Sequence, residues 1–447
     1  MHRSTLALAL VTPLLLFALA CDEPVPSAAD PGAEPPAPVP PTQVENRYDP
    51  HNYAFPRPTT GPDGQPYDGP FFDVPEDWPA TAPAAPDGPW NNYQEITAEN
   101  VNDFMVDLRN WVLGIMLPVD WRVQQQSPDQ RWYSGPWMPR ETVRGMYDGN
   151  NQPAGSYGPE QTDCAVNYTV DLYGHPGGYT FGQVWGDLSR TVFDPNISAT
   201  STQFPQGAVV VKLAMTSLPI EQVPSLRKAP SWWIYRDSVV GPADCSSSTN
   251  GPLEWIEVRV VQMDVIVKDE RLAPETGWVF GTLAYNQGAD PRGWDGNPET
   301  EAWYQSSAVG AMWGNDPGVT PGNPLEQSMI YPQISEVNAK LLGYGGRVSG
   351  PIDGGQPQPG ATPGSACMSC HGTAQVPVNF ALLVPPTGLT EQELMKWFQN
   401  RPGDVPFTAG DIATDYDFII AAGAANAEQG AQGKSFSEME SIVGKHH

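Results

Sequence analysis

Two thiols and one imidazole lie within five residues in the segment Cys367-Met368-Ser369-Cys370-His371. Sulfur and ring nitrogen this close together support three kinds of chemistry. They can ligate zinc, exchange disulfides, or attach a haem covalently while the histidine binds its iron. The residues around this motif indicate which of the three chemistries it supports.

Zinc and disulfide exchange both lack the context that they need. A structural zinc site requires a second pair of Cys or His ligands nearby. No cysteine follows Cys370, and only His446 and His447 follow His371. A thioredoxin-like cysteine pair lies in a strand–turn–helix context. Here a Gly- and Pro-rich loop over 354–360 precedes Cys367 instead. The spacing therefore favours one covalent haem c, with His371 as the proximal iron ligand.

The stretch 366–374 (ACMSCHGTA) resembles the haem site of bacterial c-type cytochromes, and the likeness extends over roughly residues 360–430. The resemblance implies a small α-helical haem module over 346–447. It also implies a second axial iron ligand, usually Met or His. We expect Met395, which lies 24 residues after His371. The other candidates are Met439, His446 and His447 downstream, and Met138 and His175 upstream.

Two helices are expected after the motif. Thr390 and Glu393 have capping-box spacing, so a helix should begin there and end near Asn400, before Pro402. A second should begin near Thr414. Lys396 and Arg401 are the cations closest to the haem motif in the sequence. They are candidates to pair with the haem propionates; the alternative is that they are solvated charges at a helix end.

The N-terminal residues read as an export and anchoring signal. Residues 1–21 combine Arg3 with an apolar stretch from Leu6 to Leu19, and they resemble a lipoprotein signal whose cysteine, Cys21, becomes lipidated. The alternative is an ordinary cleaved signal followed by an unrelated cysteine. Residues 22–45 hold 8 Pro and five acids without a basic or aromatic residue, and we expect 22–94 to be an acidic, Pro-rich linker. The protein should therefore sit at a bacterial cell envelope, on the periplasmic or cell-surface side, tethered to a membrane through lipid at Cys21.

Two cysteines remain, Cys164 and Cys245. Export implies an oxidising compartment, where such a pair usually forms a disulfide, although two separate buried thiols are the alternative.

Charge restricts the partners. With 23 basic and 51 acidic residues the formal net charge is −28, which argues against nucleic-acid binding and favours a basic redox partner. The 50 Pro and 44 Gly residues favour a loop-rich fold with short strands.

Residues 95–345 should form a β-rich domain. One helix is indicated with Thr97 as its N-cap, because apolar residues recur every three to four positions from Val101 to Ile115. Residues 166–173, 207–215 and 254–268 read as strands, and a phase shift at Val260–Val261 predicts a β-bulge. The fold class is thus mainly β with some α: an antiparallel sandwich or open barrel followed by the haem module.

Three aromatic segments, 132–138, 177–185 and 277–282, look like motifs of uncharacterised bacterial haem c proteins. Their rings could line a ligand groove or pack in the core. The acidic loop 290–301 could bind Ca²⁺, but it lacks EF-hand spacing and also reads as a plain loop.

The expected function is one-electron transfer at the cell envelope. One alternative is a haem-dependent, peroxidase-like oxidoreductase with an open distal site. The other is a ligand-binding β domain with haem as a redox accessory. No nucleophile motif appears in the middle domain. Whether the protein is an enzyme stays open, with an electron carrier favoured over a haem oxidoreductase.

Overall fold

The computed structural model describes residues 57–69, 75, 77–186, 194–240, 245, 249–318, 325–330, 367–383, 385–386 and 389–431. Contacts divide the chain into residues 1–44 and 45–447, and all described residues belong to the second unit. Residues 1–21, with the expected lipidation site Cys21, lie outside the described part, as do 346–366 and the C-terminal residues from 432 onward.

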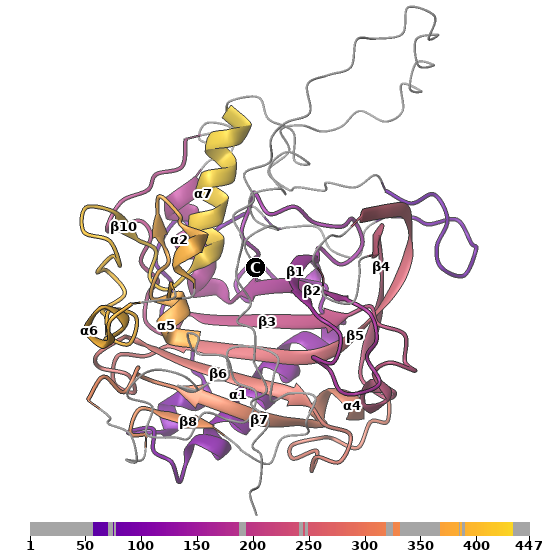
Figure 1. Ribbon diagram of the computed structural model, residues 1–447, viewed down its shortest axis with the longest axis horizontal. Coiled ribbons are helices and arrows are strands. Elements are labelled where there is room, and N and C mark those ends of the chain that lie inside the picture. The colour runs from indigo at the N-terminus through magenta and orange to yellow at the C-terminus, as the bar shows by residue number, and fades with distance from the viewer. Residues whose placement is uncertain are drawn as a thin grey trace, which may run out of the picture. The chain divides into compact units, whose positions relative to one another are not determined.

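One antiparallel sheet of eight strands forms the centre of the described chain (Figure 1). The strand order is β1-β2-β3-β5-β6-β7-β8, and β4 pairs with β5 off this path. The strands are β1 (Tyr147–Gln152), β2 (Ala165–Tyr173), β3 (Val209–Thr216), β4 (Ser231–Val240), β5 (Thr249–Lys268), β6 (Trp278–Tyr285), β7 (Ser306–Met312) and β8 (Ser328–Ile330). The prediction of a mainly antiparallel β fold is confirmed, but these strands pair into a single sheet and not into the two sheets of a sandwich.

The predicted bulge is confirmed in β5. Ala214 pairs with Gln262 and the next residue, Met215, pairs with Val260, so Val261 is the extra residue on β5. The register shift explains the change of phase in the sequence, because one inserted residue exchanges the two faces of a strand.

The long α1 (Val101–Met116) covers one face of the sheet. Phe104, Leu108 and Val112 recur on one side of this helix and are fully buried. They pack in one cluster with β-sheet residues such as Val211 and Val265. The helix begins at Val101, later than the predicted Thr97, because Asn100 accepts a hydrogen bond from the Thr97 amide at 2.9 Å and Thr97 stays in a turn.

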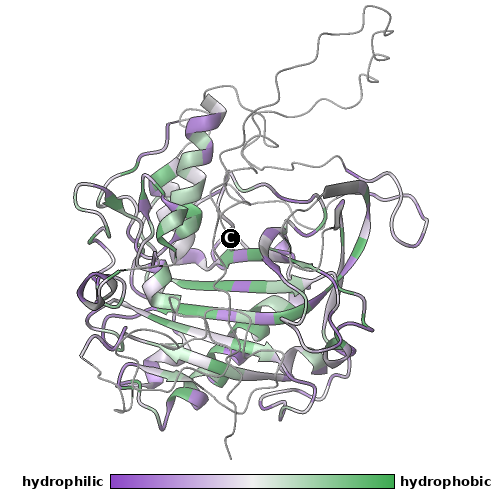
Figure 2. Ribbon diagram, in the orientation of Figure 1, coloured by the Kyte–Doolittle hydropathy of each residue, from purple (hydrophilic) through white to green (hydrophobic). Residues whose placement is uncertain are grey.

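The opposite face of the sheet carries a different set of side chains, since successive residues of a strand point to opposite sides. Its apolar members pack with the C-terminal residues. Hydrophilic residues interrupt the hydrophobic central strands in Figure 2. This second face is the one that positions the candidate site.

The remaining helices are short except for two. They are α2 (His175–Trp185), α4 (Glu301–Tyr304), α5 (Cys367–His371), α6 (Glu391–Leu394) and α7 (Phe418–Ala431), with short 3₁₀ turns at Pro89–Asn92, Leu117–Val119, Val123–Gln125, Pro224–Leu226 and Phe380–Leu382. A two-stranded sheet pairs β9 (Gln375–Val376) with β10 (Ile412–Ala413).

The C-terminal residues share a hydrophobic cluster with the large sheet. Met368, Phe380 and Ile420 pack in the same cluster as Tyr173 and Phe280. Among the described residues, 367–431 contain only α5, α6, α7, the 3₁₀ turn at Phe380–Leu382 and the small sheet, so the expected cytochrome-like helical module is not what this segment shows.

Both expected C-terminal helices differ from the prediction. The capping box is present, since Thr390 N donates to Glu393 Oε2 at 2.8 Å and Glu393 N to Thr390 Oγ1 at 3.3 Å. The helix nevertheless ends at Leu394 and not near Asn400, because Trp397 turns in to pack on Phe407 and donates to the Leu382 carbonyl at 2.8 Å. The second helix begins at Phe418, after a turn built by Thr414–Asp417.

Part of the predicted linker is packed on the domain. Trp90 is buried in the hydrophobic cluster between α1 and the sheet. Trp78 is buried in the cluster that the sheet shares with the C-terminal residues. The packed unit therefore begins before residue 95.

Candidate functional site

A cavity of about 390 Å³ lies between the sheet and the C-terminal elements, and Cys367, Cys370 and His371 all line it. These three side chains come from one turn of helix, α5. The facing wall comes from β2, β3, β5 and β6, and Phe418 and Ile419 come from the start of α7. Much of the lining is apolar: Val210, Ile266, Phe280, Phe380, Leu383 and Phe418.

The imidazole of His371 is held in one orientation. Its Nδ1 lies 2.8 Å from the carbonyl oxygen of Tyr416 and donates to it. The ring also contacts Phe280 and Phe418, with centroid distances of 5.2 Å and 5.4 Å. A proton on Nδ1 leaves Nε2 as the nitrogen with a lone pair, which is the form that ligates a metal.

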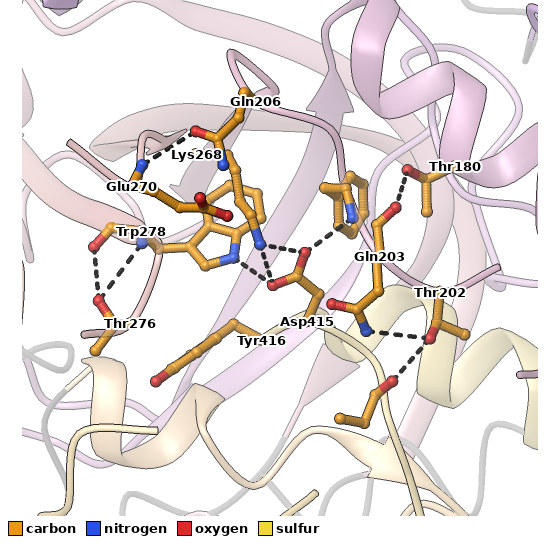
Figure 3. A network of polar contacts seen from close by, with 12 residues as sticks. Thr180, Thr202, Gln203, Gln206, Lys268, Glu270, Thr276, Trp278, Asp415 and Tyr416 are labelled. Atoms are coloured by element: carbon orange, nitrogen blue, oxygen red, sulfur yellow. Dashed lines mark hydrogen bonds and ion pairs between the residues drawn. The ribbon is translucent and has the colours of Figure 1, made fainter. Parts of the chain in front are cut away.

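Asp415 anchors the turn that carries this carbonyl (Figure 3). Both of its carboxylate oxygens lie 2.7 Å from Lys268 Nζ, and Trp278 Nε1 donates to one of them at 2.7 Å. The backbone amide of Phe204 donates to the other at 2.8 Å. Asp415 is 1% exposed and Lys268 6%, so this is a buried ion pair with several additional hydrogen bonds.

The turn itself has an uncommon backbone. Asp415 and Tyr416 both have positive φ, 51° and 69°, in the left-handed region that costs energy for a non-glycine residue. The Asp415 hydrogen bonds hold this conformation, which directs the Tyr416 carbonyl toward His371. Asp415 is therefore a positioning residue for the histidine.

The next residue, Asp417, connects the turn to α7 and to the sheet. Its Oδ1 accepts the amide of Ile420 at 2.6 Å, and its Oδ2 accepts the hydroxyl of Tyr173 at 2.6 Å. Burial raises the pKa of Asp417 to about 7.

A row of polar side chains crosses the sheet wall of the cavity. Asp171 of β2 pairs with Lys212 of β3, Lys212 with Asp264 of β5, and Asp264 with Thr282 of β6. All four line the cavity, and we call them the polar row. Asp264 Oδ1 accepts from Thr282 Oγ1 at 2.7 Å and from Gln262 Nε2 at 2.5 Å.

The polar row and the thiols of Cys367 and Cys370 line the same cavity. Burial raises the pKa of Asp171 to about 6 and also raises that of Asp264. Burial raises the pKa of the Cys367 thiol well above its ordinary value; the Asp264 charge adds to this rise and the Lys212 charge opposes it. Cys367 is thus a neutral thiol close to the charges of the row.

The expected distal ligand lies elsewhere. Met395 packs partly buried against Trp397, Phe398 and Phe407, a separate cluster that contributes no residue to the cavity wall. Met138 lines the cavity and is 2% exposed. His175 begins α2 and is not a lining residue, and Met439, His446 and His447 lie outside the described residues.

The expected propionate partners also lie outside the cavity wall. Lys396 and Arg401 both stack over Phe407, with their cationic groups 4.0 Å and 5.1 Å from its ring centroid. Lys212 lines the cavity instead. A lysine inside the β-branched run Val209–Leu213 was the sequence signal that could have marked it.

The remaining cysteines form the predicted disulfide. Cys164 and Cys245 are bonded, with a Cα–Cα distance of 5.2 Å. The alternative of two separate thiols is therefore wrong.

The aromatic segments are mainly core. Trp132, Trp137, Trp185 and Trp278 are each at most 3% exposed, so they do not form an open stacking groove, although Trp278 also borders the cavity. In the part of the chain that the structure describes, no group of three or more His, Cys, Asp or Glu side chains is arranged to hold a metal ion, and this includes the loop 290–301.

Comparison of this chain with protein-family models, with curated proteins and with solved structures finds no match. None of the helices within the described ranges is long and apolar enough to cross a membrane. The functional argument therefore rests on the cavity and the sequence motif.

Proposed function

We propose that this protein is a c-type cytochrome that carries out one-electron transfer at a bacterial cell envelope. The observation that supports this best is the meeting of Cys367, Cys370 and His371 at one cavity, with the histidine Nδ1 bonded to the Tyr416 carbonyl. The spacing of the three residues and the tautomer of the ring both suit a covalently attached haem.

The residues of the cavity fit that group. The Cys367 and Cys370 thiols would form the two thioether bonds, and His371 Nε2 would bind iron. The apolar lining would exclude water, which is the environment that a haem crevice needs. When bound, the haem would supply the Fe(III)/Fe(II) couple, whereas the protein residues orient the axial nitrogen and set its hydrogen bonding.

Met138 is the distal ligand that we propose. Its thioether lines the same cavity as His371, whereas Met395 does not. A thioether opposite an imidazole is a common ligand pair in electron-carrying cytochromes c and raises their reduction potential.

The cellular setting is proposed from the sequence. Lipid on Cys21 would tether the protein to a membrane, on the periplasmic or outer side. The formal charge of −28 favours a basic redox protein as partner and disfavours nucleic acid.

A second function, a haem-dependent and peroxidase-like oxidoreductase, is supported by the polar row. Carboxylates and an ammonium group on the wall of a haem cavity are the groups that can move protons to a small oxidant. Spectra with and without carbon monoxide separate the two functions. A low-spin iron that ignores carbon monoxide indicates a carrier, and a high-spin iron that binds it indicates the enzyme. The β domain as a plain ligand-binding unit is a third reading, which a ligand screen would test.

The primary test is covalent haem. We expect the protein, expressed in a host that matures cytochromes c and then denatured, to keep the mass of one haem and to stain for it. The Cys367→Ser/Cys370→Ser variant should have the bare polypeptide mass, and Cys164→Ser/Cys245→Ser should keep the haem. An unmodified wild-type mass in a competent host would refute the proposal.

A further inference from the structure

We propose that the sheet wall of the cavity is a binding subsite for a small, neutral molecule that carries an N–H or O–H donor, with Asp171 as its acceptor. This inference rests on the proposed function, because it assigns the ligand class of the same cavity. It starts from the polar row and not from the haem motif.

Strand register brings the subsite together. Asp171, Lys212 and Asp264 are direct cross-strand neighbours on three adjacent strands, and all three side chains lie on the cavity face. Thr169 lies two residues before Asp171 on β2, so it shares this face. Directly opposed residues on neighbouring strands have Cβ atoms only about 5 Å apart, which makes these groups one site.

Two polar atoms of the subsite are unsatisfied. Among the described residues, neither Asp171 Oδ2 nor Thr169 Oγ1 has a hydrogen-bond partner, although both are inaccessible to solvent. Asp171 is 7% exposed and Thr169 3%. A buried acceptor without a partner costs free energy, and such groups in native proteins usually have an unseen one. Both residues line the cavity, so a rotation of the Asp171 carboxylate would present Oδ2 to a ligand there.

The charges of the row select the ligand. Lys212 lies between two carboxylates, and the charge of Arg140 also acts on Asp171, so acidic and basic groups nearly balance and neither an anion nor a cation is favoured. A cation would meet the Lys212 ammonium. A neutral molecule with a donor for Asp171 and an acceptor for Lys212 satisfies both, and the cavity volume of about 390 Å³ requires that it be small.

Imidazole and 1-methylimidazole are matched probes for this subsite. Both bind ferric haem iron through one nitrogen and shift its absorption spectrum, but only imidazole has a second nitrogen that can donate. Any resident iron ligand must be displaced by both probes, so the ratio of their Kd values isolates the N–H group. The titrations use the holoprotein at about pH 8, where the probes are neutral and Asp171, with a pKa of about 6, is ionised.

We expect wild type to prefer imidazole and Asp171→Ala to lower that preference about tenfold, the worth of one hydrogen bond to a charged group. Asp171→Asn keeps the shape of the side chain and a neutral acceptor, so its preference should fall between the two. The exposed Asp404→Ala serves as the charge-matched control and should equal wild type.

The outcomes are distinguishable. Missing covalent haem in wild type refutes the proposed function, and the subsite with it. Covalent haem together with an equal probe preference in wild type, Asp171→Asn and Asp171→Ala refutes the subsite alone. That second result is also expected if the polar row instead pairs with the haem propionates. A wild-type iron that binds neither probe refutes the subsite as well.

Discussion

The Nδ1 of His371 lies 2.8 Å from the carbonyl oxygen of Tyr416, a residue 45 positions further along the chain. This hydrogen bond leaves Nε2 as the ring nitrogen that could ligate a metal. It depends in turn on a buried carboxylate, since Asp415 holds the backbone of the same turn through Lys268, Trp278 and the Phe204 amide.

Asp415→Ala should destabilise the protein and loosen the histidine. Removing one partner of a buried ion pair costs about 3–5 kcal/mol, because the Lys268 ammonium remains buried without its counter-charge. Urea unfolding measures the loss of free energy, and resonance Raman or electron paramagnetic resonance of the holoprotein reports the axial histidine. We expect haem to stay attached through the cysteines while the axial signature changes. The exposed Asp404→Ala should change neither, and an unaltered spectrum for Asp415→Ala would show that the anchor is structural only.

Gly403→Ala should act on the same anchor from outside the site. A Cβ at position 403 would overlap Asp415 Oδ1, so the carboxylate must move. Overpacking of this kind costs about 1–3 kcal/mol. Gly114→Ala is the control, because no atom lies within 4 Å of its added Cβ and alanine favours the α1 helix. The midpoint of thermal unfolding should fall for the first variant and stay the same or rise for the second.

Met138→Ala and Met395→Ala should separate the two candidate thioethers. Met138 lines the cavity and Met395 packs in a different cluster, so only the first change should remove a thioether–iron absorption band and lower the reduction potential. Absorption spectra and potentiometric titration measure both effects. Loss of the band in Met395→Ala would reverse the assignment.

Removal of the disulfide should reduce stability strongly. Cys164 and Cys245 are separated by 81 positions, and closing a loop of that length contributes about 4–5 kcal/mol in the chain-entropy model. The Cys164→Ala/Cys245→Ala variant should lose that much unfolding free energy in denaturant titrations under oxidising conditions. Its haem content should equal that of wild type, because neither residue lines the cavity.

Stability should fall with rising pH through the titration of Asp417. Burial raises its pKa from 3.8 to about 7, so between these values the unfolded chain has lost a proton that the folded chain still holds. The contribution is fully present below about pH 4 and is lost as the pH rises to about 7, at up to about 1.4 kcal/mol per pH unit. Asp417→Asn keeps the Oδ1 acceptor for the Ile420 amide and should flatten this slope. A slope identical to wild type in urea titrations across that range would contradict the assignment.

Local sequence was sufficient for features whose partners are close along the chain. The Cys367–His371 spacing, the α1 periodicity, the Thr390–Glu393 capping box and the phase shift at Val261 each depend on neighbours within a few residues. The disulfide was also predictable, because only two cysteines remained to be paired after the other three were assigned.

Tertiary structure decided what depends on distant partners. Lys268 and Asp415 are 147 positions apart, and the polar row joins three strands whose register no single segment determines. Tertiary packing also shortened α6 relative to the helix that the local sequence favours. The helix ends early because Trp397 packs on Phe407 and donates a hydrogen bond to the Leu382 carbonyl. Side-chain spacing along the chain cannot report which faces meet in space, so the sequence did not indicate that Met138 and Lys212, and not Met395, line the cavity.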